Sequence, residues 1–352
     1  LISNDGMIVT LSHRGYVKRT AASEYRVQAR GGKGVRGMET RNANASDDDE
    51  SDFVEHLFTA QAHDYLMFFT NTGRVYVERV YGLPEGSRAS KGRSLQNVLN
   101  LLPEESIAAV LRLEFKKDEE GNDVTFSEDG GNVFFATRAG KVKKTSLNDF
   151  RNYRKAGTIA IKLDEGNELI GVRLTSGKDD VMLVTHKGMS TRFKEEQARV
   201  MGRNSAGVRG IKPREGDFVV GLAVVNDDAR LLVASENGIG KRTPFGDYMA
   251  KNRGGVGMIT MKCTEKTGQV IGATSVEEED ELMLMTDGGQ SIRIRVSDVR
   301  ECGRNTQGVK LVTLTKGEKL QAIARVMPDD ESAETENQEE AESETDGDTE
   351  EK

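Results

Sequence analysis

The stretch "NVFFATRAGKVKKTSL", residues 132–147, contains two apolar runs on either side of a polar turn that ends in Gly140. Such a pattern is typical of a β-hairpin, because glycine accepts the positive φ that tight turns require. The same pattern occurs six times along the chain. The hairpins are predicted near residues 7–20, 65–80, 132–147, 181–193, 230–245 and 281–296, with turn glycines Gly15, Gly73, Gly140, Gly188, Gly238 and Gly289.

Two further elements recur in each unit. A second glycine follows the turn glycine by nineteen residues in five units and by seventeen in the third, and five units have arginine four residues before it. A short apolar run then closes each unit. Six units of about 50 residues, each with three to four strands, favour an all-β, propeller-like ring, because radial closure limits exposed sheet edges. We expect the last apolar run, residues 319–326, to complete the first sheet and lock the ring.

Composition narrows the class of protein. The chain has 352 residues, no tryptophan and only 5% aromatic residues. No apolar run approaches the length of a membrane span, and no signal peptide opens the chain. The two cysteines, Cys263 and Cys302, are too few for a disulfide framework or a zinc site, so we expect a cytosolic protein with reduced thiols. Because the chain begins with Leu1, we read it as a piece of a longer protein.

The net charge of −8 conceals a segregation of charge. Residues 328–352 carry thirteen acidic residues and one lysine, which leaves 49 basic and 45 acidic residues in 1–327. Two acidic inserts, 41–55 and 116–130, interrupt this cationic frame. We expect the tail 328–352 and the acidic inserts to be disordered, because they have little apolar content to bury. The folded domain is therefore predicted to span 1–327.

Basic residues recur at fixed places in the units. Arg19, Lys144, Arg192, Arg242 and Arg293 follow the turn glycine by four residues. One cation at the same point of each blade predicts a ring of positive charge that suits a continuous polyanion, held by phosphate contacts that do not read sequence. The alternative is that these cations only solvate outward strand positions. The predicted rim comprises Lys18, Arg19, Arg36, Arg79, Arg88, Lys91, Arg93, Lys143, Lys144, Arg192, Arg203, Arg209, Lys241, Arg242, Arg253, Arg293, Arg295, Arg304 and Lys310.

Other ligands and catalysis have little support. Aromatic stacking platforms are missing, which favours duplex over single-stranded nucleic acid. In "GGKG", residues 31–34, the lysine precedes glycine rather than Ser or Thr, so a phosphate-binding Walker loop is disfavoured. His13 and His186 fall in hairpin turns, where we expect exposed side chains rather than catalytic bases. No metal site and no acid–base pair is predicted.

The segment "QARGGKG", residues 28–34, resembles the heptapeptide Q-R-R-G-G-R/K-G, the gyrase box of the C-terminal domain of DNA gyrase A subunits. Six of its seven positions agree, and Ala29 stands where the family has arginine. The segments "RASKG", "YRKAG", "RNSAG", "RGGVG" and "RNTQG" are similar to the degenerate copies of that family. The resemblance covers about residues 2–327.

This resemblance implies a six-bladed β-pinwheel of four-stranded blades in which neighbouring blades exchange strands. It implies double-stranded DNA wrapped around the basic rim, in support of ATP-dependent negative supercoiling by an A2B2 type II topoisomerase. The box that would anchor the DNA comprises Gln28, Ala29, Arg30, Gly31, Gly32, Lys33 and Gly34. The implied partners are gyrase B and the N-terminal domain of gyrase A, in the bacterial cytoplasm at the nucleoid and with no membrane. No cofactor is implied for this fragment, since the cleaving tyrosine, ATP and Mg²⁺ belong to other parts of that enzyme.

Two alternatives stay open. The C-terminal domain of a topoisomerase IV A-type subunit is the close one, although six units plus the box favour gyrase. A protein-binding propeller with incidental cations is the other. A propeller hydrolase would need a convergent acid or metal cluster, and the sequence offers none.

Overall fold

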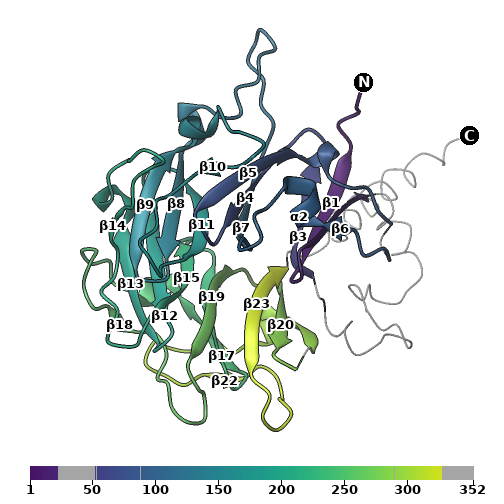
Figure 1. Ribbon diagram of the computed structural model, residues 1–352. Helices are drawn as coiled ribbons and strands as arrows, with labels where there is room; N and C mark the ends of the chain where they lie inside the picture. The colour runs from purple at the N-terminus through teal and green to yellow at the C-terminus, as the bar shows by residue number, and fades with distance from the viewer. Residues whose placement is uncertain (23–51, 53, 88, 289, 327–352) are drawn as a thin grey trace, which may run out of the picture.

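The six repeated hairpins form the centre of six separate antiparallel sheets. The computed structural model describes residues 1–352 except 23–51, 53, 88, 289 and 327–352, and the sheets follow one another around a ring (Figure 1). At the five described turn glycines φ lies between 78° and 95°. The hairpins are β1 (Gly6–Ser12) with β2 (Tyr16–Ala21), β4 (Tyr65–Thr70) with β5 (Arg74–Arg79), β8 (Asn132–Thr137) with β9 (Lys141–Ser146), β12 (Asp180–Thr185) with β13 (Met189–Lys194), β16 (Arg230–Ser235) with β17 (Ile239–Pro244), and β20 (Glu281–Thr286) with β21 (Ser291–Arg295).

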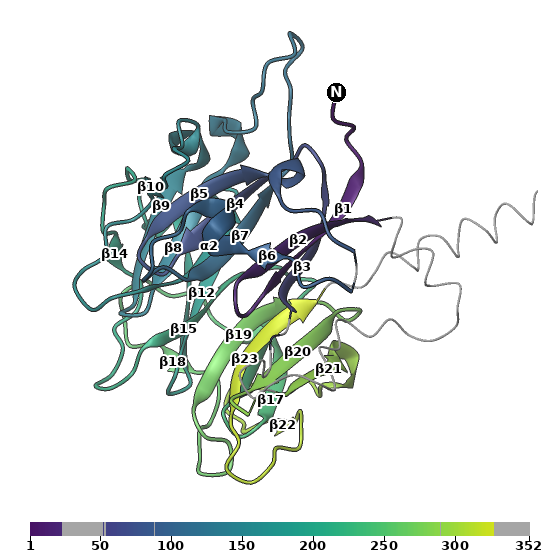
Figure 2. The ribbon, with the colours of Figure 1, turned by 45° about the vertical axis from the view of Figure 1, so that its right-hand side comes forward.

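The apolar run that closes each unit is a third strand, which pairs with the first strand of its own hairpin. These strands are β3 (Val54–Gln61), β7 (Ile107–Leu113), β11 (Leu169–Thr175), β15 (Val219–Val224), β19 (Val270–Val276) and β23 (Leu320–Val326). The expectation that the last run completes the first sheet is wrong, because β23 pairs with β20 in the sixth sheet and β3 holds the corresponding place in the first. The two ends of the ring still meet, since β23 lies beside β3 (Figure 2).

The fourth strand of each sheet comes from the following unit. Five two-residue strands begin one residue after a second glycine, and each pairs with the hairpin of the preceding unit. We call them the outer strands: β6 (Arg93–Ser94), β10 (Thr158–Ile159), β14 (Val208–Arg209), β18 (Met258–Ile259) and β22 (Val309–Lys310). The predicted all-β, six-bladed fold with strand exchange is thereby confirmed. In the described part of the chain the sixth sheet has three strands.

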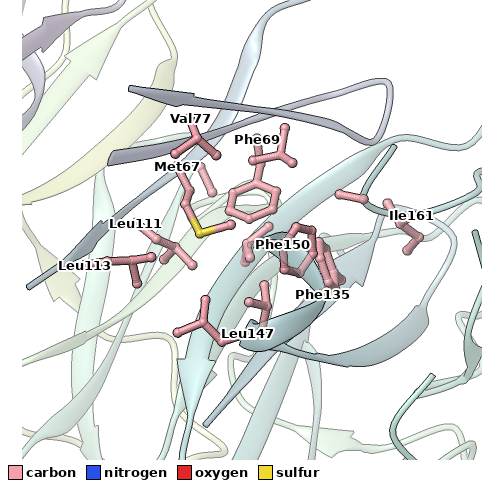
Figure 3. Packing of buried hydrophobic residues seen from close by; sticks show 14 of the residues in the cluster. Met67, Phe69, Val77, Leu111, Leu113, Phe135, Leu147, Phe150 and Ile161 are labelled. Carbon is pink, nitrogen blue, oxygen red and sulfur yellow. The ribbon is translucent and has the colours of Figure 1, made fainter. Parts of the chain in front are cut away.

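Apolar cores fill the joints between successive sheets and cover both faces of the inner ones. On β8, Phe135 packs with Phe69 and Phe150 toward the second sheet (Figure 3). Its neighbour Phe134 points the other way, into the core shared with Phe193 of the fourth unit. Because successive strand residues point to opposite faces, both sides of a hairpin lie against a neighbouring unit. Only loops and the outer strands are left to form the circumference.

Short helices connect the hairpins to the segments that follow. Single turns come directly after the second hairpin strand in five units: η1 (Val80–Gly82), η3 (Leu147–Phe150), η4 (Glu195–Gln197), η5 (Phe245–Asp247) and η6 (Val296–Asp298). The others are α2 (Leu95–Leu99), after β6, and η2 (Glu128–Gly130), before β8. Among the described residues, no helix has the length and apolarity to cross a membrane.

The acidic insert 116–130 has defined structure, so the expectation of disorder is wrong there. Its tip is a turn in which the carboxylate of Asp118 accepts hydrogen bonds from the backbone amides of Glu120 and Asn122. Its base is fixed by Asp123, whose carboxylate accepts a hydrogen bond from the Tyr65 hydroxyl at 2.5 Å. Phe126 adds an apolar contact at the same place, since its ring centroid lies 5.1 Å from that of Tyr65, so the insert is anchored by both polar and aromatic side chains.

Candidate nucleic-acid interface

The ring of cations four residues after the turn glycine exists, but it ties the units together. The Arg19 Nε donates to Leu83 O at 2.9 Å, directly after η1. The Lys144 Nζ donates to Glu195 O at 3.0 Å, and the Arg242 Nε donates to Val299 O at 2.6 Å. In each case the acceptor lies in or beside the single helical turn of the next unit.

The same position in the fourth unit behaves alike, and the sixth differs. Arg192 Nη1 donates to Phe245 O of the next unit at 2.9 Å. Arg293 is exposed and forms an ion pair with Glu281 of its own sheet. The cations therefore recur as predicted. The expectation that their side chains form an exposed ring is wrong for the four that bind the next unit.

Five predicted rim residues have buried side chains, so their predicted exposure is wrong. Their side chains point toward the following unit, whose backbone carbonyls they bind, rather than outward to solvent. Burial lowers the pKa of the Lys143 ammonium to about 7 and the pKa of the Lys241 ammonium to about 8. The five residues are Lys18, Lys143, Lys144, Lys241 and Arg242.

Arg79, predicted as the rim cation of the second unit, anchors the acidic insert. Its guanidinium lies over the rings of Tyr65, at 4.1 Å, and Phe115, at 4.7 Å. It also pairs with Asp123 at 3.7 Å. With its side chain only 20% exposed, Arg79 contributes little to a polyanion surface.

The segments that run from the recurrent arginine to the second glycine lie between adjacent units; we call 203–207, 253–257 and 304–308 the arginine loops. Arg203 Nη1 donates to Ile159 O at 3.0 Å, and Arg304 Nη1 donates to Ile259 O at 3.1 Å. Arg253 Nη1 donates to the backbone oxygen of Arg209 at 2.9 Å. Each acceptor is the last residue of an outer strand of the preceding unit, and each arginine side chain is half-buried. These three predicted residues therefore lie at the circumference with part of the guanidinium in contact with solvent.

The remaining described rim residues are exposed. They lie on outer strands, beside them, or on β21, which is the edge of the sixth sheet in the described part. Lys91 additionally lies over the Tyr16 ring at 4.2 Å. The exposed set is Lys91, Arg93, Arg209, Arg293, Arg295 and Lys310. Gln28–Gly34, Arg36 and Arg88 lie outside the described residues.

Further exposed cations recur at two places that were not predicted. The first set consists of lysines five residues after the second glycine. The backbone amide of each lysine donates a hydrogen bond to a backbone oxygen in an arginine loop of the next unit. The other set follows the turn glycine by eleven residues. Both recurrences were visible in the sequence. The two sets are Lys162, Lys212 and Lys262, and Arg151, Arg199 and Arg300.

The two histidines predicted in hairpin turns have different surroundings: His13 is exposed, whereas His186 packs against the neighbouring segment. His186 is half-buried rather than exposed, since its ring stacks on Phe218 with centroids 4.5 Å apart and its Nδ1 lies 2.8 Å from Val270 O. The described residues contain no cluster of His, Cys, Asp and Glu that could hold a metal ion.

Comparison with known proteins identifies the family. The family model of the DNA gyrase C-terminal domain, a beta-propeller, matches residues 6–59, 64–114, 131–176, 179–226, 229–277 and 280–327. The DNA gyrase A protein of Escherichia coli K12 is 45% identical over 326 residues, which cover 93% of this chain and 35% of the relative. The DNA gyrase A protein of Staphylococcus aureus MRSA252 is 42% identical over 342 residues, or 97% of this chain and 36% of the relative. The chain thus spans about a third of the length of these relatives.

Two solved structures share the fold. The DNA gyrase A C-terminal domain matches with a TM-score of 0.68 and 25% identity, covering 92% of this chain and 100% of that one. The C-terminal domain of DNA topoisomerase IV matches with a TM-score of 0.75 at 23% identity, covering 96% of this chain and 99% of that one, and shows the fold alone. Six matched repeats, the relatives and the fold agree, and the chain belongs to the family of DNA gyrase C-terminal beta-propeller domains.

Proposed function

We propose that this chain binds duplex DNA along its circumference and wraps it, as the C-terminal domain of a DNA gyrase A protein. The observation that carries the proposal is the recurrence of exposed cations where adjacent units meet. These cations lie on the outer strands or in the loops on either side of those strands. Phosphate contacts of this kind fix the path of a duplex and carry no sequence information. Binding is therefore expected to depend weakly on base sequence.

Charge and geometry support a wrapped duplex. Residues 1–327 carry 49 basic and 45 acidic residues, and many acidic ones belong to the two inserts. Bending a duplex smoothly over 20–30 base pairs costs on the order of 1–6 kcal/mol. A dozen exposed cations spread over successive joints offset that cost through many weak contacts. The box Gln28–Gly34 is proposed as a further anchor on the first unit.

The larger assembly follows from the family. In an A2B2 enzyme with gyrase B, the wrap would present a neighbouring DNA segment for strand passage and bias ATP-dependent supercoiling toward negative. The cleaving tyrosine, ATP and Mg²⁺ would belong to the rest of that enzyme. Such an assembly would act in the bacterial cytoplasm, on nucleoid DNA.

Two measurements test the proposal. The affinity of the 352-residue chain for a duplex should fall steeply with salt, with a slope of log K on log salt of about −5 to −10 for six to eleven neutralised phosphates. Ligating nicked circles with the chain bound should change their linking number, and bovine albumin at equal concentration is the control. Affinity that is indifferent to salt, or an unchanged linking number, would remove the proposal and favour a protein-binding propeller.

A further inference from the structure

Three buried lysines occupy equivalent positions in alternate units. Lys18, Lys143 and Lys241 each follow the turn glycine by three residues in the first, third and fifth units. Their side chains are at most 1% exposed. The second and fourth units have Tyr76 and Thr191 at this place, so the lysines mark every other joint.

Each of these ammonium groups binds backbone carbonyls of the next unit. The Lys143 Nζ donates to Gly202 O at 3.0 Å and to Arg203 O at 2.8 Å, and also to Ala160 O at 2.5 Å. The Lys241 Nζ donates to Gly303 O at 2.8 Å, Arg304 O at 2.6 Å and Thr306 O at 3.0 Å. In the first unit the Lys18 Nζ donates to the equivalent carbonyls of Ser87 and Ser90, at 2.9 and 2.5 Å.

We call the oxygen atoms around each of these ammonium groups a carbonyl cage. All three cages include the carbonyl of the residue directly before the recurrent arginine of the next unit, which is Ser87, Gly202 or Gly303. In the third and fifth units the cage therefore holds the start of an arginine loop, and the guanidinium of that arginine bonds to the preceding outer strand. The end of the loop is seated by glycine: a Cβ on Gly207 would lie 2.2 Å from Val142 O, and one on Gly308 would lie 2.5 Å from Gly240 O. Each loop is thus fixed at both ends against the strand that carries the lysine.

The chemistry of the cage suits an ammonium group and no other common side chain. An ammonium has three donors and no acceptor, and a buried charge needs partners for each donor. In the described part of the chain, Lys143 and Lys241 form no ion pair with a carboxylate, and their hydrogen-bond partners are backbone carbonyls together with the Thr306 hydroxyl beside Lys241, at 3.0 Å. A methionine would fill the same volume but leave the carbonyls without a donor.

We propose that Lys143 and Lys241 are positioning residues for DNA binding, which act through the arginine loops 203–207 and 304–308 and do not contact phosphate themselves. The inference rests on the proposed function. Its consequence is that Arg203 and Arg304 are held in place by a buried lysine of the preceding unit. Arg253 has no such lysine, because Thr191 occupies the corresponding position.

The test is a double-mutant cycle in the 352-residue chain, read as duplex affinity against salt. Lys143→Met should weaken binding about three- to tenfold and reduce the salt slope by about 0.9, the share of one phosphate, although no exposed charge is removed. Combined with Arg203→Ala, it should cause no loss beyond that of Arg203→Ala alone. Combined with the control Arg304→Ala, whose loop is held by Lys241 and whose guanidinium bonds to Ile259 O, the two losses should multiply. Multiplication in both cycles, or an unchanged salt slope, would overturn the inference.

Hydrogen exchange supplies a readout that does not need DNA. Lys143→Met should speed exchange in residues 202–207 about tenfold and leave 303–308, which Lys241 holds in the same molecule, unchanged. Lys241→Met should reverse the pattern. If neither variant folds, the lysines serve stability alone and the positioning role is wrong. If the wild-type chain binds no DNA, the proposed function fails, while the exchange result still decides whether the lysines order the loops.

Discussion

Substituting Gly207 with alanine should destabilise the fold well beyond the ordinary cost of alanine in a left-handed conformation. Gly207 has φ +89°, and an added Cβ would lie 2.2 Å from Val142 O, inside contact distance of a backbone atom that belongs to the neighbouring sheet. Gly166 provides a matched control, because it has φ +77° and no other atom within 4 Å of the place that a Cβ would take. The two substitutions share the backbone penalty and differ in the clash.

The magnitude follows from these two terms. A non-glycine residue in the left-handed region costs roughly 1–2 kcal/mol, which sets the expected loss for Gly166→Ala. Forcing a methyl group into a packed site costs a further 1–3 kcal/mol or so. We therefore expect Gly207→Ala to lose about 2–5 kcal/mol of unfolding free energy.

Urea unfolding of the 352-residue chain, followed by circular dichroism, measures both losses. Gly207→Ala should also weaken duplex binding, since the glycine ends the loop that begins with Arg203. Equal losses for Gly166→Ala and Gly207→Ala would refute the reasoning, because they would show that the outer strand yields freely at this joint.

Three further outcomes are expected. Deleting residues 319–326 removes the strand that pairs with β20, so the melting temperature should fall sharply, and an unchanged melting curve would contradict the assigned pairing. Replacing Lys162, Lys212 and Lys262 together with alanine should reduce the salt slope of duplex binding by about 2.7 without a change in melting, because all three are exposed; an equal slope would place them off the DNA path. The pKa of Lys143 is lowered to about 7 from 10.5 by burial, so the unfolded chain binds more protons between pH 7 and 10. The wild type should therefore gain up to about 1.4 kcal/mol per pH unit relative to Lys143→Met over that window, as urea unfolding at several pH values would show, and a constant difference would contradict the assignment.

The repeated strands could be predicted from the sequence because each has a local pattern. The hairpin at 132–147 shows apolar runs, a turn and a glycine within sixteen residues. Pairing between units has no such signature, since two-residue strands such as Val208–Arg209 are too short to show a period. The seven-residue run Leu320–Val326 has a clear strand pattern, but that pattern does not say which sheet the strand joins, so its predicted place in the first sheet is wrong.

The direction of a side chain was the main property that recurrence did not reveal. Lys143 and Arg209 both recur as cations, yet one is buried among carbonyls and the other is exposed. Lysine is rarely fully buried, so a repeated lysine was assigned to the surface. The carbonyl cage that accepts Lys143 is assembled from residues about sixty positions away, which local reasoning does not bring together.

The borrowed outer strands have a consequence for how such a chain can change in length. Five outer strands each join a unit to its predecessor, so within the described residues every seam from the first unit to the sixth is built in the same way. Excising one complete unit, from one turn glycine to the next, preserves every remaining donor and acceptor and alters only the curvature of the circle. A deletion that begins or ends within a unit would leave two β-strands without their pairing partners. Gain or loss of whole units is thus the expected route, and the circumference of the disc is set by the number of units.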